Sequence, residues 1–153
     1  MKFGTAESCT SGALARKFTS VPGSSEYFEG SIVAYSAKLK QNLLGVPADL
    51  IENHGIVSLE VAESMALGGA ETLGVDICLS STGVAGPGGG TIGIPVGTVC
   101  LAIAKSGSVH SWKKQLEGSR EEVVEKSVDF LFSRLADVLD DAEKSRFFAL
   151  LNF

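Results

Sequence analysis

The stretch PGSSEYFEGSIVAYSAKLKQ, residues 22–41, decides the fold we expect, because it contains signals for a turn, a strand and a helix in close succession. Pro22 to Ser25 is typical of a turn, and the β-branched, alternating residues from Gly30 to Tyr35 predict a strand. Ser36 is a good helix N-cap residue, and Gly45 ends the short helix that follows. The stretch therefore predicts a strand that leads directly into a helix.

Three side chains of this stretch are suited to nucleophilic catalysis. A serine hydroxyl is a weak nucleophile until a base takes its proton, and a lysine becomes such a base when burial lowers its pKa. Ser25, Tyr35 and Lys40 are therefore candidate catalytic residues if the fold brings them together. Residues of these three types also occur in turns, strand ends and helices without any catalytic role, and the spacing alone does not decide between the two interpretations.

The composition excludes several classes of protein. The 153 residues suit one domain with a sizeable core. With 44% hydrophobic residues, 20% charged residues and a net charge of −5, the chain is neither disordered nor a nucleic-acid binder by bulk charge. No apolar run approaches the ~18 residues of a membrane helix and no secretory leader is recognisable, so we expect no membrane association.

Cysteine and histidine usage argues against disulfides and metals. Cys9, Cys78 and Cys100 form no C-x-x-C pair, and the chain has only two histidines. We therefore expect neither a disulfide framework nor a metal site. The pattern favours a reduced, cytoplasmic protein that needs no cofactor.

Two further stretches have the composition of ligand-binding loops. TAESCTSG, residues 5–12, leads into a helical segment, and a turn of this kind offers hydroxyls and free N–H groups to an anion, although ordinary helix capping explains it equally well. Cys9 in this stretch is a rival nucleophile, but a small buried cysteine is the commoner case. The apolar run VDICLSS, residues 75–81, predicts a buried strand that ends in TGVAGPGGGTIGIP, residues 82–95. Such a glycine-dense loop lets backbone N–H groups approach a ligand closely, although a plain surface loop would look the same.

The second half of the chain predicts a hairpin and a long helix. VGTVCLAIA and SVHSWKKQL, residues 96–104 and 108–116, flank a short turn and indicate two antiparallel strands. Ser119 and Glu122 form a capping box that begins the helix. Arg120 lies in the first helical turn, where a cation opposes the helix dipole, so its presence indicates a role other than helix stability, such as a clamp for phosphate.

Strand and helix signals alternate and then end in the hairpin. This order predicts a single three-layer α/β/α domain with a mixed β-sheet over residues 1–153. The last residues are unusually apolar, and we expect this tail to pack on the core or on another subunit. The apolar tail residues are Phe147, Phe148, Leu150, Leu151 and Phe153.

Six blocks of the sequence, in order, resemble the CinA C-terminal domain family. They are TAESCTSG (5–12), GSSEYFEGSIVAYSAKLK (23–40), HGIVSLEVAESMA (54–66), STGVAGPGGG (81–90), PVGTV (95–99) and EGSR (117–120). The resemblance implies a nicotinamide-nucleotide amidase, which hydrolyses the carboxamide of nicotinamide mononucleotide to nicotinate mononucleotide and ammonia without a metal.

The resemblance also implies roles for individual residues. Ser25 would be the nucleophile, a choice over Ser24 that rests on the family pattern alone, with Lys40 as the base and Tyr35 orienting the pair. The substrate would be held by Ser8, Thr10, Thr82, Gly83 and Arg120.

The sequence departs from the family at its start. Ser11 stands where the family usually has glycine, and the helix and longer strand that normally precede this block are missing or truncated. Two alternatives therefore stay open: a non-catalytic nucleotide-binding module with a competence-related role, and an amidase for another nucleotide-like amide. We expect the chain to bind a small-molecule substrate. We also expect it to form a homo-oligomer, such as a dimer.

Overall fold

The computed structural model of the protein describes the backbone of residues 1–151 and the side chains of residues 1–149. Within these residues the centre is a five-stranded sheet with the strand order β2-β1-β3-β4-β5. The strands are β1 (Phe3–Glu7), β2 (Phe28–Val33), β3 (Ile77–Gly83), β4 (Thr98–Lys105) and β5 (Ser108–Gln115). β1 is parallel to β2 and β3, whereas β4 is antiparallel to β3 and β5. The sheet is therefore mixed, and the predicted hairpin is confirmed as β4 and β5.

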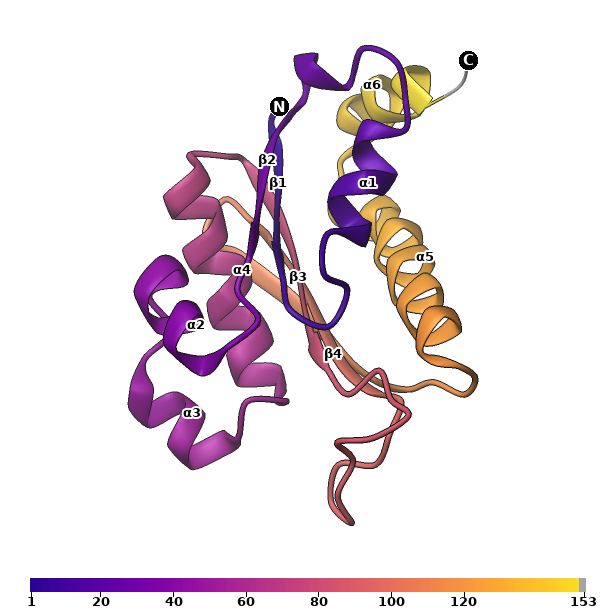
Figure 1. Ribbon diagram of the computed structural model, residues 1–153. Helices are drawn as coiled ribbons and strands as arrows, with labels where there is room; N and C mark the ends of the chain where they lie inside the picture. The colour runs from indigo at the N-terminus through magenta and orange to yellow at the C-terminus, as the bar shows by residue number, and fades with distance from the viewer. Residues whose placement is uncertain (152–153) are drawn as a thin grey trace.

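Helices cover both faces of the sheet (Figure 1). One face carries α1 (Ala13–Thr19), α5 (Arg120–Val138) and α6 (Asp141–Leu151), and the other carries α2 (Ala37–Leu44), α3 (Ala48–His54) and α4 (Leu59–Leu73). A short 3-10 helix, η1 (Ser24–Glu26), precedes β2. The predicted three-layer α/β/α architecture is confirmed. Within residues 1–151, no helix has the length and apolarity needed to cross a membrane.

Side-chain caps fix where α2, α4 and α5 begin. Ser36 and Ser58 each accept a hydrogen bond from a backbone N–H three residues further on, at the starts of α2 and α4. Ser119 and Glu122 form the predicted capping box of α5, in which each side chain accepts a hydrogen bond from the other's backbone. Arg120 is consequently the first residue of α5.

Aromatic side chains fill the layer between the sheet and α1, α5 and α6. The ring of Phe3 lies 5.3 Å from that of Phe18 and 5.1 Å from that of Phe147. Phe147 is 1% exposed, so the expected packing of the apolar tail on the core is confirmed at this residue, whereas Phe148 is 43% exposed. The side chains of Leu150, Leu151 and Phe153 lie outside the described part of the chain.

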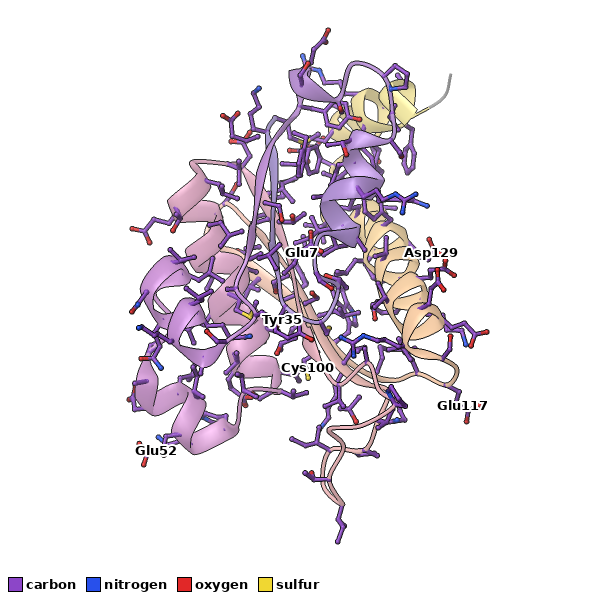
Figure 2. All side chains as sticks on the ribbon, viewed as in Figure 1. Glu7, Tyr35, Glu52, Cys100, Glu117 and Asp129 are labelled. Carbon is purple, nitrogen blue, oxygen red and sulfur yellow. The ribbon has the colours of Figure 1, made fainter. Side chains whose placement is uncertain are left out.

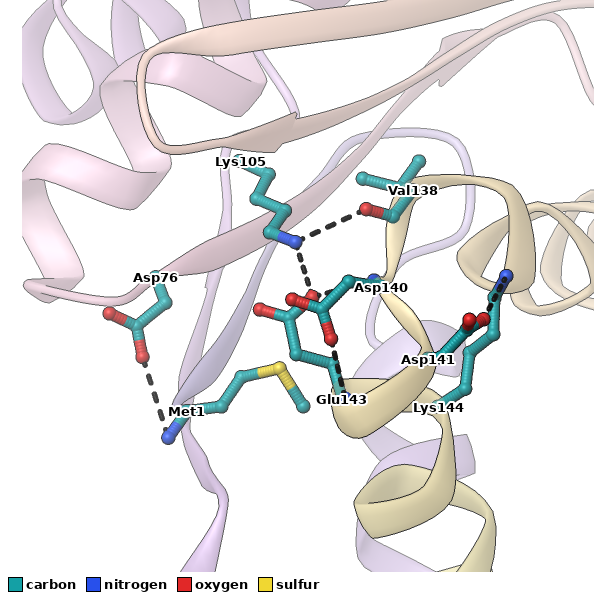
Figure 3. A network of polar contacts seen from close by, with 8 residues as sticks. All are labelled: Met1, Asp76, Lys105, Val138, Asp140, Asp141, Glu143 and Lys144. Atoms are coloured by element: carbon teal, nitrogen blue, oxygen red, sulfur yellow. Dashed lines mark hydrogen bonds and ion pairs between the residues drawn. The ribbon is translucent and has the colours of Figure 1, made fainter.

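A polar network attaches the start of α6 to the end of β4 (Figure 3). The ammonium group of Lys105 donates to the backbone carbonyl of Val138 at 3.2 Å and forms an ion pair with Glu143. Asp140 and Glu143 cap each other's backbone N–H groups at the start of α6. Because Lys105 bonds on both sides of the turn that joins α5 to α6, it fixes the direction in which α6 leaves.

The topology gathers polar loops at one end of the sheet. β1, β2 and β3 are parallel, so their carboxyl ends meet there. The chain leaves β1 toward α1 on one face and leaves β2 toward α2 on the other, which makes this end a place where ligands bind in open α/β sheets. The loop between β3 and β4 projects beyond the same end (Figure 1).

Candidate active site

Ser8 is the first residue after β1, and it faces away from α1. Side chains alternate along a strand, and Glu7 points into the turn that begins α1, so Ser8 points to the opposite face, where α2 and α4 lie. The Oγ atom of Ser8 accepts a hydrogen bond of 2.8 Å from the Nζ atom of Lys40. A serine and a lysine from two distant segments thus form a contact pair.

Lys40 is fully buried although it lies on a short surface helix. Its second hydrogen bond, of 2.9 Å, goes to the backbone carbonyl of Ala34. Among the residues that the structure describes, no carboxylate forms an ion pair with Lys40. Burial lowers the pKa of Lys40 from 10.5 to about 8, because removing the ammonium from water disfavours the charged form. The neutral form of Lys40, which is able to accept a proton, therefore becomes populated as the pH approaches 8, well below the usual pKa of a lysine.

The expected meeting of Ser25 with Tyr35 and Lys40 does not occur. Ser25 is exposed on η1, before β2, whereas Lys40 follows the other end of β2. The six residues of β2 separate the two positions by about 20 Å at ~3.3 Å per residue. The turn predicted at Pro22 to Ser25 is present, but it precedes β2, whereas the lysine follows the opposite end of that strand. Ser8 takes the place beside Lys40 that the sequence interpretation gave to Ser25.

A cavity of about 250 Å³ opens beside the Ser8–Lys40 pair. It is walled by the start of the α1 turn, by Tyr35, by the end of β3, by the glycine-dense loop and by Arg120. The lining residues are Ser8, Cys9, Tyr35, Lys40, Ile56, Val57, Thr82, Gly83, Val84, Ala85, Gly86, Gly88, Gly89 and Arg120. Segments from the whole length of the chain thus contribute to one site.

Arg120 joins the glycine-dense loop to Tyr35 across this cavity. Its guanidinium donates 2.8 Å and 3.0 Å hydrogen bonds to the carbonyl of Gly86 and the hydroxyl of Tyr35. Tyr35 is 58% exposed and lies two residues beyond the end of β2, as labelled in Figure 2. Because its oxygen accepts from Arg120, the tyrosine keeps its own proton for donation. Both acceptors of the arginine are neutral, which leaves its charge available to an anion.

Of the three remaining residues predicted to bind substrate, two line the cavity and one does not. Thr10 is 2% exposed and lies outside the cavity lining, and its hydroxyl bonds to Glu7 and Ser81, so its position does not support the predicted substrate contact. Thr82 lines the cavity, but its hydroxyl donates to the carbonyl of Ile56 at 2.8 Å. Gly83 also lines the cavity, and a Cβ atom there would lie 2.7 Å from the carbonyl oxygen of a β4 residue. Close packing against β4 therefore explains this glycine.

Cys9 is a poor rival for the role of nucleophile. It lines the cavity but is only 5% exposed. Burial raises the pKa of its thiol to about 11, with an opposing contribution from a hydrogen bond with Ser81. The reactive thiolate is consequently scarce near neutral pH.

The neighbouring Ser11 has a φ of 44°, a left-handed conformation that glycine adopts at lower cost.

In the described part of the chain, no group of three or more His, Cys, Asp or Glu side chains is arranged to hold a metal ion.

The sequence profile of the CinA C-terminal domain matches residues 1–139. The chain belongs to the CinA C-terminal domain family. A CinA-like protein of Mycolicibacterium vanbaalenii is 50% identical over 124 residues, which cover 80% of this chain and 29% of that protein. A CinA-like protein of Mycobacterium leprae is 42% identical over 144 residues, covering 93% and 34% respectively.

Solved structures agree with this CinA assignment. A competence-damaged protein (CinA) superfamily protein of Escherichia coli has a TM-score of 0.87 and 31% identity, covering 91% of this chain and 81% of its own. Competence damage-inducible protein A of Klebsiella pneumoniae has a TM-score of 0.86 and 32% identity, covering 89% and 84%. This CinA domain spans about a third of the length of the curated relatives it matches.

The sequence interpretation missed the pairing of Ser8 with Lys40 and the buried polar groups of Glu7 and Ser81. One available signal was the place of Ser8 directly after a strand and before a helix, a position that holds the exposed nucleophile in α/β-hydrolases. Glu7 offered a second signal, because an acidic residue in an otherwise buried strand requires hydrogen-bond donors around it.

Proposed function

We propose that this chain is a nicotinamide-nucleotide amidase that uses Ser8 as nucleophile and Lys40 as base. The proposal rests chiefly on the 2.8 Å contact between Lys40 Nζ and Ser8 Oγ at the wall of a cavity. Membership of the CinA C-terminal domain family supports the substrate class, since the sequence resembles members with this activity.

The reaction follows from the two groups in contact. Neutral Lys40 takes the proton of Ser8 as the Oγ atom bonds to the carboxamide carbon. The carbon–nitrogen bond then breaks, and Lys40 gives its proton to the departing nitrogen, so that ammonia leaves and an ester on Ser8 remains. Water attacks this ester while Lys40 accepts the water's proton, and nicotinate mononucleotide leaves as Ser8 regains a proton. The low pKa of Lys40 suits both the accepting and the donating step.

Other residues that line the cavity suit the phosphate and ribose of the substrate. Arg120 offers a planar, charged fork to the phosphate, and the glycine-dense loop from Ala85 to Gly89 lets a nucleotide approach the backbone closely. Tyr35 also lines the cavity, and its hydroxyl proton is suited to orienting the carboxamide or assisting the leaving group.

The test is ammonia release from nicotinamide mononucleotide by purified protein. Because the steps above use only Ser8 and Lys40, we expect turnover in the presence of a chelator. Ser8→Ala and Lys40→Met should abolish turnover, and Ser25→Ala, which changes an exposed serine far from the cavity, should retain it.

Other outcomes change the proposal in defined ways. If Ser25→Ala is inactive and Ser8→Ala is active, the nucleophile assigned here is wrong. A wild-type protein that binds nicotinamide mononucleotide without turnover supports the non-catalytic module instead. Turnover of a different nucleotide-like amide keeps the mechanism and moves the substrate.

A further inference from the structure

Glu7 is a fully buried carboxylate on which donors from three segments converge. One oxygen, Oε2, accepts from the Thr10 hydroxyl at 2.6 Å and from two backbone N–H groups of the α1 turn, those of Gly12 and Leu14. The other oxygen, Oε1, accepts from the Thr5 hydroxyl at 3.1 Å, from the Ser31 hydroxyl and from the backbone N–H of Ala15. This is far more than the capping of a two-turn helix requires.

The chemistry of the carboxylate sets the direction of the neighbouring hydrogen bonds. The Thr10 hydroxyl donates its single proton to the Oε2 atom of Glu7. The Thr10 oxygen lies 2.7 Å from the Ser81 Oγ atom, and this contact is then made by the proton of Ser81. Both lone pairs of the Ser81 Oγ atom are consequently available to accept.

The Oγ atom of Ser81 accepts a hydrogen bond from the backbone N–H of Ser8. The Ser8 N–H lies 3.0 Å from the carbonyl oxygen of Ser81 and 3.3 Å from its Oγ atom. A chain of directed hydrogen bonds thus runs from Glu7 through Thr10 and Ser81 to the main chain of Ser8. Ser81 and Glu7 are also register partners in β3 and β1.

Glu7 itself lies outside the cavity lining. It points to the α1 face of the sheet, and neither Glu7 nor Thr10 lines the cavity. Any effect on the reaction has to pass through the placement of Ser8.

We propose that Glu7 is a positioning residue for Ser8, acting through Thr10 and Ser81. This inference rests on the proposed role of Ser8 as nucleophile. The directed chain holds the peptide at Ser8 in the orientation that keeps Oγ beside Lys40 Nζ. Small displacements of a reacting group are costly, with about 100-fold in rate for a shift near 1 Å.

Thr10→Val and Thr5→Val form a matched pair that separates positioning from simple burial of a carboxylate. Each replaces one buried threonine by a residue of the same shape and removes one hydroxyl donor from Glu7. Only Thr10 continues the chain to Ser81 and Ser8. We expect Thr10→Val to lower kcat at least about 10-fold with KM within about 2-fold of wild type, and Thr5→Val to leave kcat within about 2-fold. Thr10→Ser, which restores a hydroxyl, should recover most of the loss.

A second measurement makes the test independent of the substrate. Ser8 should react with a fluorophosphonate, in which the Oγ–P bond forms, the P–F bond breaks and Lys40 takes the proton. Labelling should slow in Thr10→Val and stay near the wild-type rate in Thr5→Val. If both variants lose kcat and labelling equally, or if their melting temperatures fall while kcat holds, Glu7 serves the fold alone and the inference is wrong. Normal labelling of the wild type without amidase turnover would overturn the proposed substrate and leave this inference standing.

Discussion

The Nζ atom of Lys40 lies 2.8 Å from the Oγ atom of Ser8, although 32 positions separate the two residues in the chain. The parallel pairing of β1 with β2 creates this contact. Ser8 follows the end of β1, Ala34 follows the end of β2, and the N–H of Ala34 bonds to the carbonyl of Glu7 at 2.8 Å. The turn after Ala34 then places α2 with Lys40 facing inward, over the first residue beyond β1.

The first prediction concerns the pH dependence of turnover. Lys40 must be neutral to accept the proton of Ser8, and burial lowers its pKa to about 8. We expect kcat/KM for nicotinamide mononucleotide to rise with pH through a midpoint near 8, well below the ~10.4 of a free lysine. Initial rates of ammonia release, measured from about pH 6 to about pH 10, provide the test.

Lys40→Arg is the control for this profile. Arginine keeps a positive charge but does not give up its proton in proteins, so the variant should be inactive across the same pH range. A variant that keeps the wild-type profile would show that another group titrates.

The second prediction concerns stability. The pKa of Lys40 is lower in the folded protein than in the unfolded chain, so between about pH 8 and pH 10.5 the unfolded state binds more protons. The free energy of unfolding therefore rises with pH across this window. Below the window, the buried ammonium destabilises the fold by its full desolvation cost. Relative to Lys40→Met, the wild type should gain up to about 3 kcal/mol between pH 7 and pH 10.5. Urea unfolding of both proteins at the two pH values measures the difference, and parallel pH dependence of the two would contradict the lowered pKa.

The layers of the fold could be predicted because they depend on local signals. The caps at Ser36 and Ser58, the capping box at Ser119 and the turn between β4 and β5 are each set by a few neighbouring residues. Alternating strand and helix signals then leave few ways to arrange a mixed sheet.

The Ser8–Lys40 pair could not be predicted in the same way, because it depends on which faces point inward. On α2, the spacing of Leu39 and Leu43 favours them as the buried stripe, yet they are 38% and 44% exposed, and Lys40 and Leu44 are buried instead. A lysine can take an inward position only if acceptors await it there. Those acceptors, Ser8 Oγ and the Ala34 carbonyl, come from tertiary structure.

The third prediction concerns the attachment of α6. Lys105 is partly buried and bonds to Glu143 and to the carbonyl of Val138, so Lys105→Met removes a charge-assisted pair and leaves Glu143 without its cationic partner. We expect the free energy of unfolding to fall by about 1 kcal/mol. Lys144→Met is the matched control, since the Lys144 ion pair with Asp141 spans 3.9 Å and the Asp141 side chain is fully exposed. Chemical denaturation of the two variants should show a loss for the first and none for the second, and equal losses would argue against this attachment.

The last prediction assigns Arg120 to the phosphate of the substrate. Its guanidinium lies on the cavity wall and bonds only to the neutral Gly86 carbonyl and Tyr35 hydroxyl among the described residues, so a phosphate would be its first charged partner. Arg120→Ala should raise KM for nicotinamide mononucleotide about 10- to 100-fold, as expected for the loss of a charge-assisted hydrogen bond, with little change in kcat. With nicotinamide riboside, which lacks the phosphate, the variant and the wild type should have similar KM values. Tyr35→Phe is the control for the lost contact with Tyr35, because it removes that hydroxyl and keeps the arginine. If Arg120→Ala weakens both substrates equally, the arginine acts through Tyr35 or the glycine-dense loop and the phosphate assignment is wrong.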